Sequence, residues 1–391
     1  MGKIKILYVH HSGSKAGAPR SLAYLIKELN KDIYEPYVVC HHDFEQNCQL
    51  FEAVGAKVIK GNYIGGWHGS TVCPVTKEIF LYNIKHVIPT YWGIRKIIRD
   101  VKPNIVHLNS TCLCFAAKSI KKAYPEIPII CHVREPLLEG GWGDILRRNC
   151  NKYVDRFVAI EEFDAKTLKT KKKIDVIYNF VDFAKYNPNI VSDCLRQELN
   201  LKSSDRILLY LARVCPENGA KELIENIQSL LKRRPDIHLC IVGANFEEQS
   251  AYLMKLEEMS KKFSNIHLIG FRSDVPEVIK SSDIMVVPFQ VPHFARSVIE
   301  AAAIGIPSIA SKIGGVDELI INGKTGLLFN YLTFEGFNTM CEKLLDDEVM
   351  YHEMSQNAVQ HARYNFSASI NAKRTIAIYQ EMLDEKLESK K

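Results

Sequence analysis

The side chains and the helix start that best suit an anionic ligand lie within residues 288–328. This stretch, PFQVPHFARSVIEAAAIGIPSIASKIGGVDELIINGKTGLL, predicts a loop, a helix over 295–304, a short strand over 308–310 and a glycine turn. Arg296 and Ser297 precede Glu300 by four and three residues, so all three share one face of that helix. Because the N–H groups of a first helical turn have no acceptor within the helix, this segment predicts a phosphate-binding site.

Charged or glycine-rich loops follow three further predicted strands. Arg213-Val-Cys-Pro-Glu-Asn-Gly-Ala-Lys221 leaves a strand over 206–212, and His132 and Arg134 lie where a strand from Pro128 runs out into a loop. A loop at 11–19, containing Gly17, links an N-terminal strand to a helix over 20–29. Ligands of open α/β sheets bind at the carboxyl ends of strands. A hydrogen-bonded core histidine at His132 and an ordinary strand–helix turn at Gly17 are the alternative interpretations.

The elements that must position these loops alternate between strands and helices. Apolar strands are predicted at 4–10, 37–40, 57–59 and 105–108, with helices near 47–54 and 89–101. A second series of strands begins at Arg206, and an amphipathic helix over 366–387 ends the pattern. Such alternation is typical of a doubly wound parallel sheet. Residues 61–82 interrupt it with glycine and aromatic residues, as functional connections often do.

Length and composition indicate a protein of two domains. The 391 residues are 47% hydrophobic and 25% charged, which is ordinary for a globular protein. No apolar run reaches the roughly 18 residues of a membrane span, and no export signal is recognised, so we expect a cytoplasmic location. The eleven cysteines lack metal-ligand spacing. They are expected to be reduced thiols, with no bound metal.

The charge is divided unevenly along the chain. Residues 1–190 carry 28 basic and 18 acidic side chains, whereas the whole chain carries 51 and 45. The basic half suits a peripheral contact with the inner face of a membrane or an anionic acceptor, and a merely solvated basic surface is the alternative. No basic motif interleaved with aromatic residues is present, so a nucleic-acid partner is not expected.

The stretch at 288–328 resembles the nucleotide-sugar signature of the GT-B glycosyltransferases, in particular retaining family 4. Glu300 falls on the signature's second glutamate, but the position of the first is Pro292. Arg213 and Gly219 match the family's Gly-Arg-(x)3-Glu-Lys-Gly loop, in which Asn218 replaces the lysine. Residues 174–182 resemble the family's Val-Ile-Tyr-Asn-Gly-Val-Asp.

This resemblance implies two Rossmann-like, doubly wound domains that face each other across a cleft. We expect an N-terminal acceptor-binding domain at 1–190, a nucleotide-sugar domain at 191–366, and a C-terminal helix at 367–391 that crosses back to the first domain. The implied activity is retaining transfer of a hexose-type sugar from a nucleotide-diphospho-sugar to a hydroxyl acceptor. The acceptor is expected to be a glycan or a lipid-linked glycan of bacterial surface polysaccharide synthesis. A catalytically weak nucleotide-sugar-binding partner protein and a GT-B sugar-nucleotide epimerase are the alternatives.

The resemblance also assigns roles to residues. The catalytic candidates are His132, Arg213 and Glu300. Lys221 is expected to reach the donor in place of the missing lysine charge at Asn218, and aromatic side chains are expected to stack on acceptor sugars. The donor-binding candidates are Gly17, Arg134, Asn218, Lys221, Gly243, Arg272, Arg296, Ser297, Val298 and Glu300. The acceptor-binding candidates are Tyr63, Trp67 and Trp142. No metal or other cofactor is implied.

Overall fold

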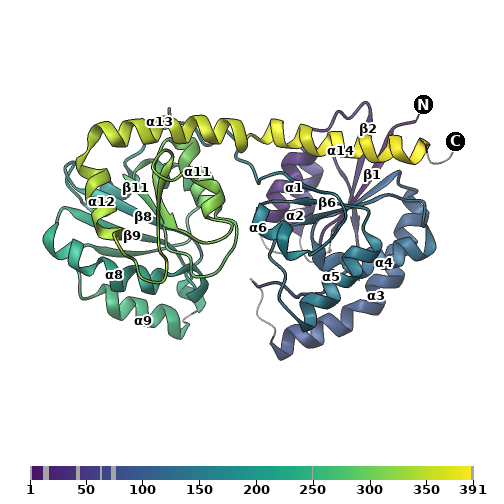
Figure 1. Cartoon of the computed structure of the whole chain (residues 1–391), viewed down its shortest axis with the longest axis horizontal. Coiled ribbons are helices and arrows are strands. Elements are labelled where there is room, and N and C mark those ends of the chain that lie inside the picture. Colours follow the sequence, from purple (N-terminus) through teal and green to yellow (C-terminus); the bar gives the residue numbers. More distant parts are fainter. Residues whose placement is uncertain are drawn as a thin grey trace. The chain divides into compact units, whose positions relative to one another are not determined.

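The chain forms two compact units, each built on its own parallel sheet (Figure 1). The computed structural model describes residues 2–11, 17–40, 45–61, 64–71, 76–248 and 250–388. Unit 1 comprises Met1–Asn179 and Ala368–Lys391, and unit 2 comprises Phe180–Ser367. Two doubly wound α/β units were predicted, and this fold class is confirmed. The division after Asn179 lies before the predicted boundary at residue 190.

Unit 1 holds a seven-stranded sheet in the order β3-β2-β1-β4-β5-β6-β7. Every pair of neighbouring strands is parallel, and the order reverses between β1 and β4. The carboxyl ends of β1 and β4 therefore lie side by side at the switch point of the sheet. The strands are β1 Ile4–Val9, β2 Tyr34–Cys40, β3 Lys57–Lys60, β4 Ile105–Leu108, β5 Ile129–Val133, β6 Arg156–Ala159 and β7 Ile174–Val176.

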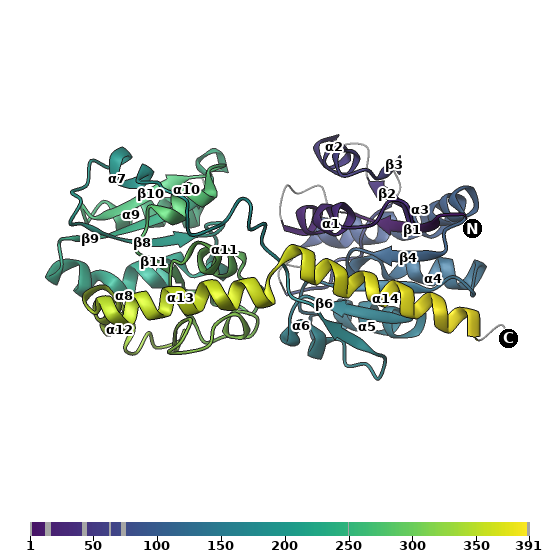
Figure 2. The ribbon, with the colours of Figure 1, turned by 90° about the horizontal axis from the view of Figure 1, so that it is seen from above.

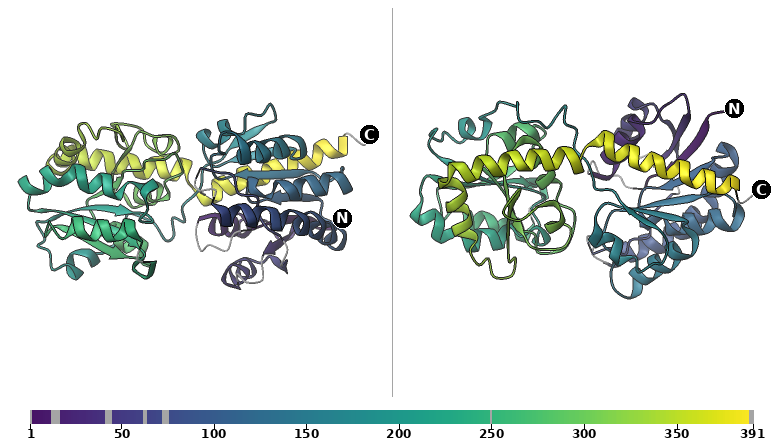
Figure 3. Two further views of the ribbon diagram at one scale, coloured as in Figure 1. Left: turned by 90° about the horizontal axis from the view of Figure 1, so that it is seen from below. Right: turned by 45° about the horizontal axis from the view of Figure 1, so that its top comes forward.

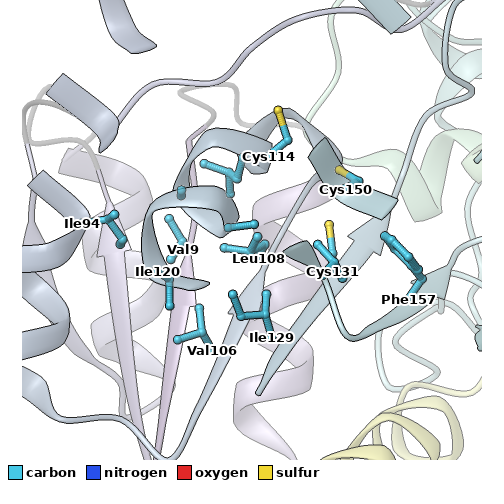
Figure 4. Packing of buried hydrophobic residues seen from close by; sticks show 14 of the residues in the cluster. Val9, Ile94, Val106, Leu108, Cys114, Ile120, Ile129, Cys131, Cys150 and Phe157 are labelled. Atoms are coloured by element: carbon cyan, nitrogen blue, oxygen red, sulfur yellow. The ribbon is translucent and has the colours of Figure 1, made fainter. Parts of the chain in front are cut away.

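Helices cover both faces of this sheet, because successive strand residues point to opposite faces. Leu7 and Val9 belong to the core that α3, α4 and α5 cover (Figure 4), whereas Ile6 and Tyr8 belong to the core beneath α1 and α2. The helices are α1 Gly17–Lys27, α2 Glu45–Ala53, α3 Lys77–Val101, α4 Cys114–Ala123, α5 Gly141–Tyr153 and α6 Glu162–Thr167, with a 3-10 turn η1 at Thr111–Leu113.

The last helix, α14 (Ala368–Glu388), belongs to unit 1 although unit 2 precedes it in sequence (Figure 2). It lies beside α1 and buries Ala372, Ile378, Tyr379 and Met382 in the core on that face of the sheet. Glu381, on its polar side, forms an ion pair with Arg156 of β6 at 2.6 Å. The sheet of unit 1 is thus completed by the C-terminal segment of the chain.

Unit 2 repeats the arrangement with six parallel strands in the order β10-β9-β8-β11-β12-β13. Its switch point lies between β8 and β11, and helices again line both faces (Figure 3). The strands are β8 Arg206–Leu211, β9 Ile237–Ala244, β10 Ile266–Gly270, β11 Ile284–Val287, β12 Ser308–Ser311 and β13 Gly326–Phe329. The α-helices are α7 Cys194–Glu198, α8 Ala220–Arg233, α9 Ala251–Ser260, α10 Val275–Lys280, α11 Arg296–Ile304, α12 Phe337–Asp346 and α13 Glu348–Asn365, and the 3-10 turns are η2 Pro216–Asn218, η3 Phe246–Glu248 and η4 Asp317–Leu319.

The main departure from the predicted elements is the length of α3. It starts at Lys77, behind an N-cap at Thr76, and continues through Pro89 to Val101. The prediction began this helix at Pro89, so residues 77–82 were wrongly included in the irregular connection at 61–82 and residues 83–88 were left unassigned. Pro89 has no N–H to donate to the carbonyl of Lys85, four residues earlier in the helix. Both residues lie on the exposed side of α3. Water can therefore replace the missing hydrogen bond.

We predict that truncating Ile378 of α14 destabilises unit 1. Ile378 is 3% exposed, and Ile378→Ala is expected to lower the free energy of unfolding by about 2 to 5 kcal/mol through the cavity it leaves. Lys373→Ala changes an exposed residue of the same helix and should stay within about 0.5 kcal/mol of the parent. Urea unfolding followed by circular dichroism measures both. Equal effects of the two variants would refute the role given to α14.

Candidate functional site

At the switch point of unit 2, the loops that follow β8 and β11 are joined through their backbones. The Gln290 N–H donates to the Glu217 carbonyl at 2.9 Å. Gly219 has a φ of +72°, and a Cβ at this position would lie 1.9 Å from the Pro288 oxygen. Only glycine fits there, so this glycine, which the sequence matched to the family loop, is required for the two loops to meet.

Arg213 is the exposed cation of the loop after β8. Its side chain forms no salt bridge with any described residue, so its charge is available to a ligand. Its carbonyl is held by the Tyr210 hydroxyl at 3.0 Å and by Nδ2 of Asn218 at 2.8 Å. Asn218, a candidate for donor binding, is buried and uses its amide to fix the loop that presents Arg213.

Two further basic candidates of unit 2, Lys221 and Arg272, have carboxylate partners. The Lys221 ammonium group lies 3.2 Å from Glu225 on α8. Arg272 is bound by Glu198 and by Asp274, and these hydrogen bonds raise its pKa. Arg272 therefore links the loop after β10 to α7, and its contact with a donor stays a prediction. The prediction that Lys221 reaches the donor stays a prediction.

Helix α11 carries the remaining donor candidates, and Gly305 ends it with a φ of +88°. Glu300 is buried in its middle, and one carboxylate oxygen lies 3.5 Å from Nε of Arg296 one turn earlier. Arg296 also donates to the Phe180 carbonyl at 3.3 Å. Ser297 and Val298 are buried in the first turn, and the Val298 N–H already donates to the Ala295 carbonyl at 3.2 Å. The part of these α11 residues in donor binding stays a prediction.

Gly243 has a structural reason of its own to be glycine. Its φ is +116°, and a Cβ would lie 2.2 Å from the Ala212 carbonyl oxygen. The end of β9 can therefore approach the end of β8 only without a side chain here. This close packing shapes the loop that carries Arg213, whether or not Gly243 contacts a ligand.

The sequence analysis did not single out His293 or Glu217. The His293 ring stacks on Phe289 with centroids 4.2 Å apart, and burial lowers its pKa. The Arg213 charge lowers the pKa of both His293 and Glu217, so all three groups belong to one electrostatic cluster beside the start of α11. In the sequence, the signal for His293 is its position three residues before the start of α11 at Arg296.

In unit 1, His132 is part of a buried chain of hydrogen bonds. Its Nδ1 lies 2.7 Å from Nε2 of His107 on β4, whose Nδ1 is hydrogen-bonded to the Tyr379 hydroxyl of α14. Burial lowers the pKa of His107 to about 3 and that of His132 well below its ordinary value, and the Arg134 charge adds to both shifts. His132 is thus a neutral hydrogen-bonding group whose ring orientation is fixed through His107 of strand β4 and, behind it, Tyr379 of helix α14.

A second polar network surrounds Arg134 at the same edge of the sheet. Its guanidinium donates to Oδ1 of Asn109 at 2.8 Å and to Oδ1 of Asn179 at 3.3 Å. Asn109 also contacts Nδ1 of His10 at 3.0 Å, and the Ser21 hydroxyl donates to Asn179 at 3.1 Å. This network joins the ends of β1, β4 and β5 to α1, the helix that Gly17 begins. Contact of His132, Arg134 and Gly17 with a donor stays a prediction.

Of the three aromatic acceptor candidates, Trp67 is buried among other rings, and the acceptor role of all three stays a prediction. Trp67 is 8% exposed and lies between Trp142, at 4.9 Å between ring centroids, and Phe115, at 5.3 Å. Because only 8% of Trp67 is exposed, stacking on a sugar would require its neighbours to move. Trp142 is half-buried, and Tyr63 lies outside the described residues.

Two family models match most of this chain. The model described as "Glycosyltransferase Family 4" matches residues 16–185, and the one described as "Glycosyl transferases group 1" matches residues 191–361.

Curated relatives show the same resemblance over different lengths. UDP-Gal:alpha-D-GlcNAc-diphosphoundecaprenol alpha-1,3-galactosyltransferase of Escherichia coli is 24% identical over 377 residues, which cover 91% of each chain. N-acetyl-alpha-D-glucosaminyl L-malate synthase of Bacillus anthracis is 24% identical over 216 residues, which cover 55% of this chain and 56% of that protein. The match to that relative therefore spans only about half its length.

Solved structures support the fold. Anabaena Alr3699/HepE in complex with UDP has a TM-score of 0.78 at 20% identity, over 97% of this chain and 100% of that one. A glycosyltransferase from Rickettsia africae ESF-5 has a TM-score of 0.80 at 20% identity, over 98% and 99% of the two chains. At 20% sequence identity, the similarity to these two structures shows a shared fold.

We predict that acidification destabilises the protein through its buried neutral histidines. His107 has a folded-state pKa of about 3 against 6.5 when unperturbed, so below about pH 6.5 the unfolded chain binds a proton that the folded state does not. The free energy of unfolding should fall by about 2 kcal/mol between pH 7 and pH 5 for this residue. His107→Gln should reduce the pH dependence by that amount. The exposed His352 serves as control, and an equal reduction by His352→Gln would contradict the assignment.

Proposed function

Because this chain belongs to the GT-B glycosyltransferases of group 1 and family 4, we propose that it transfers a hexose-type sugar from a nucleotide-diphospho-sugar to a hydroxyl acceptor, with retention at the anomeric carbon. The observation that carries the proposal is the junction of the β8 and β11 loops, which presents the exposed Arg213 at the switch point of unit 2. Glu300 of α11, which follows the β11 loop, would bind the ribose of the donor.

The proposed chemistry needs no protein nucleophile. The bond between the anomeric carbon and the diphosphate oxygen breaks as the acceptor oxygen bonds to that carbon on the same face. The acceptor proton passes to the departing diphosphate. Negative charge grows on the diphosphate, and Arg213 together with the first-turn N–H groups of α11 would stabilise it. Asn218 carries no charge, so Arg213 bears more of this role, and no metal is required.

We further propose that the acceptor is a lipid-linked or membrane-bound glycan of a bacterial surface polysaccharide. The support is by analogy: the E. coli relative that matches 91% of this chain acts, by its name, on a diphosphoundecaprenol-linked sugar. A Campylobacter jejuni relative, 27% identical over 244 residues, is likewise named for a diphospho-undecaprenol substrate. Uridine is the first donor base to test, since the Anabaena structures contain UDP or UDP-glucose.

Helix α3 supplies a surface that fits such an acceptor. Among the described helices, none has both the length and the apolar character needed to cross a bilayer. Yet α3 exposes five large apolar side chains, mostly one helical turn apart, and each is between 40% and 68% exposed. They are Phe80, Leu81, Ile84, Ile88 and Trp92. The helix also carries five basic and two acidic residues, so it suits shallow insertion into an anionic membrane surface.

We predict that Arg213→Ala and Glu300→Gln each weaken UDP binding by about 1 to 3 kcal/mol, through loss of a charged hydrogen bond. Calorimetric titration with UDP, with and without magnesium, measures this. The exposed Lys324 of unit 2 provides a matched control, and Lys324→Ala should bind like the parent. Lys221→Ala, tested beside them, shows whether that ammonium group leaves Glu225 to reach the diphosphate.

The same titrations discriminate between the functions. Unchanged affinity in both Arg213→Ala and Glu300→Gln would remove the donor site from this junction. Binding without transfer or hydrolysis of any UDP-sugar would favour the catalytically weak partner protein. Conversion of the UDP-sugar to an epimer without acceptor would favour the epimerase.

We also predict that the exposed face of α3 binds anionic vesicles. Ile84→Asp combined with Ile88→Asp should reduce co-sedimentation with phosphatidylglycerol vesicles about tenfold or more, because two apolar side chains no longer enter the bilayer surface. Leu332→Asp with Val349→Asp places the same charges on residues of unit 2 that are 74% and 70% exposed. If both pairs reduce sedimentation equally, charge repulsion explains the loss and α3 is not the contact.

A further inference from the structure

We propose that His11, His68 and Cys112 form a binding site for a zinc-like transition-metal ion at the carboxyl edge of the unit 1 sheet. Each residue offers one ligand atom, and the three atoms lie within 4.8 Å of one another. This site uses none of the residues assigned above to the donor. It also does not depend on the proposed transfer reaction, and it departs from the expectation that no metal binds.

The topology of the sheet brings these distant residues together. His11 follows the end of β1, and Cys112 lies in η1, which follows β4 after a short link. Because β1 and β4 are neighbours at the switch point, both residues reach the same edge. His68 comes from the segment between β3 and α3. In the sequence the three are separated by 57 and 44 positions, so no local spacing could have revealed the site.

The backbone around the cluster is fixed by specific hydrogen bonds. The Trp67 N–H donates to the Cys112 carbonyl at 2.8 Å. The Asn83 side chain of α3 accepts from the His68 N–H at 2.8 Å and donates to the His68 carbonyl at 2.9 Å. These hydrogen bonds fix the backbone of Cys112 and of His68 in the absence of an ion. Such preorganisation lowers the cost of assembling a metal site.

Gly66 shows how closely the segment approaches the other two ligands. A Cβ at this position would lie 2.8 Å from Cδ2 of His11 and 3.1 Å from Cβ of Cys112. A side chain at residue 66 would push His11 and Cys112 away from His68. The glycine thus permits the convergence of the three side chains.

The ligand chemistry favours a borderline-soft ion such as Zn²⁺. Two imidazole nitrogens and one thiolate are typical zinc ligands, and a site with three protein ligands keeps a fourth position for water or substrate. Sγ of Cys112 lies 4.0 Å from Nδ1 of His68. Tetrahedral coordination brings such atoms to roughly 3.3 to 3.7 Å, which small rotations of the rings supply.

Burial prepares both histidines for coordination. Nδ1 of His11 is buried and has no hydrogen-bond partner among the described residues. Burial lowers the pKa of His11 to about 3 and also lowers that of His68, so both rings are neutral at pH 7 and keep a lone pair for a metal. On binding, the Cys112 thiol loses its proton to solvent and the thiolate coordinates the ion.

Titration of the reduced, metal-free full chain with Co²⁺ tests the proposal, because cobalt reports its ligands by absorption. One equivalent should produce a sulfur-to-cobalt charge-transfer band in the near ultraviolet and the intense visible bands of a tetrahedral site. Added Zn²⁺ should abolish both, and excess Mg²⁺ should not. Absence of the charge-transfer band from the wild-type protein would overturn the proposal, whatever the variants do.

The variants locate the site among the eleven cysteines. Cys112→Ser should remove the charge-transfer band, and His68→Ala should weaken Zn²⁺ binding by at least about 100-fold, the upper range for loss of a residue that merely supports a ligand. Cys215→Ser removes a half-buried thiol of unit 2 and should leave the cobalt spectrum unchanged. A spectrum that survives Cys112→Ser, or disappears in Cys215→Ser, would place the metal elsewhere and refute the assignment.

Discussion

The structure of each unit depends on one constraint, which is that a parallel sheet must be covered on both faces. Alternate residues of β1 enter opposite cores, so neither face of the unit 1 sheet can be left in water. Helices α3, α4 and α5 cover one face, and α1, α2 and α14 cover the other. With both faces closed, the strand edges are the places where polar side chains can meet a ligand.

The two switch points use this edge in different ways. In unit 2 an exposed guanidinium, that of Arg213, stands on a loop fixed by backbone hydrogen bonds and by Gly219. In unit 1 the corresponding edge holds the buried, neutral imidazoles of His107 and His132, and the Arg134 guanidinium there is bound by two asparagine side chains. The first edge suits an anion, whereas the second suits neutral groups or a metal ion.

Local patterns in the sequence were sufficient for the fold class and for the loops that carry the candidate residues. Strands of β-branched residues and helix ends marked by glycine, such as Gly305, depend on neighbouring residues alone. Contacts between distant residues could not be read in this way. The ion pair of Glu198 with Arg272, the packing of Trp67 against Trp142, and the hydrogen bond between Tyr379 and His107 all require the folded chain.

The start of α3 was mispredicted for a different reason. Proline usually ends a helix, but Pro89 lies on a solvated side where the lost hydrogen bond costs less. A helix that covers a core has apolar residues on its buried face and polar residues on its exposed face. The residues of α3 before Pro89 depart from this pattern, because several apolar side chains lie on the exposed face.

The placement of α14 determines the order in which the protein can be completed during synthesis. Unit 2 is continuous, from Phe180 to Ser367, so all of it leaves the ribosome before the last helix does. Unit 1 begins first but lacks Ile378, Tyr379 and Met382 until α14 has been synthesised. Until then one face of its sheet is incompletely covered, and His107 lacks its phenol partner. Unit 1, although its synthesis begins first, therefore reaches its final structure only after unit 2 has been synthesised. A ribosome that stops before α14 would release a chain whose unit 1 sheet has an open face.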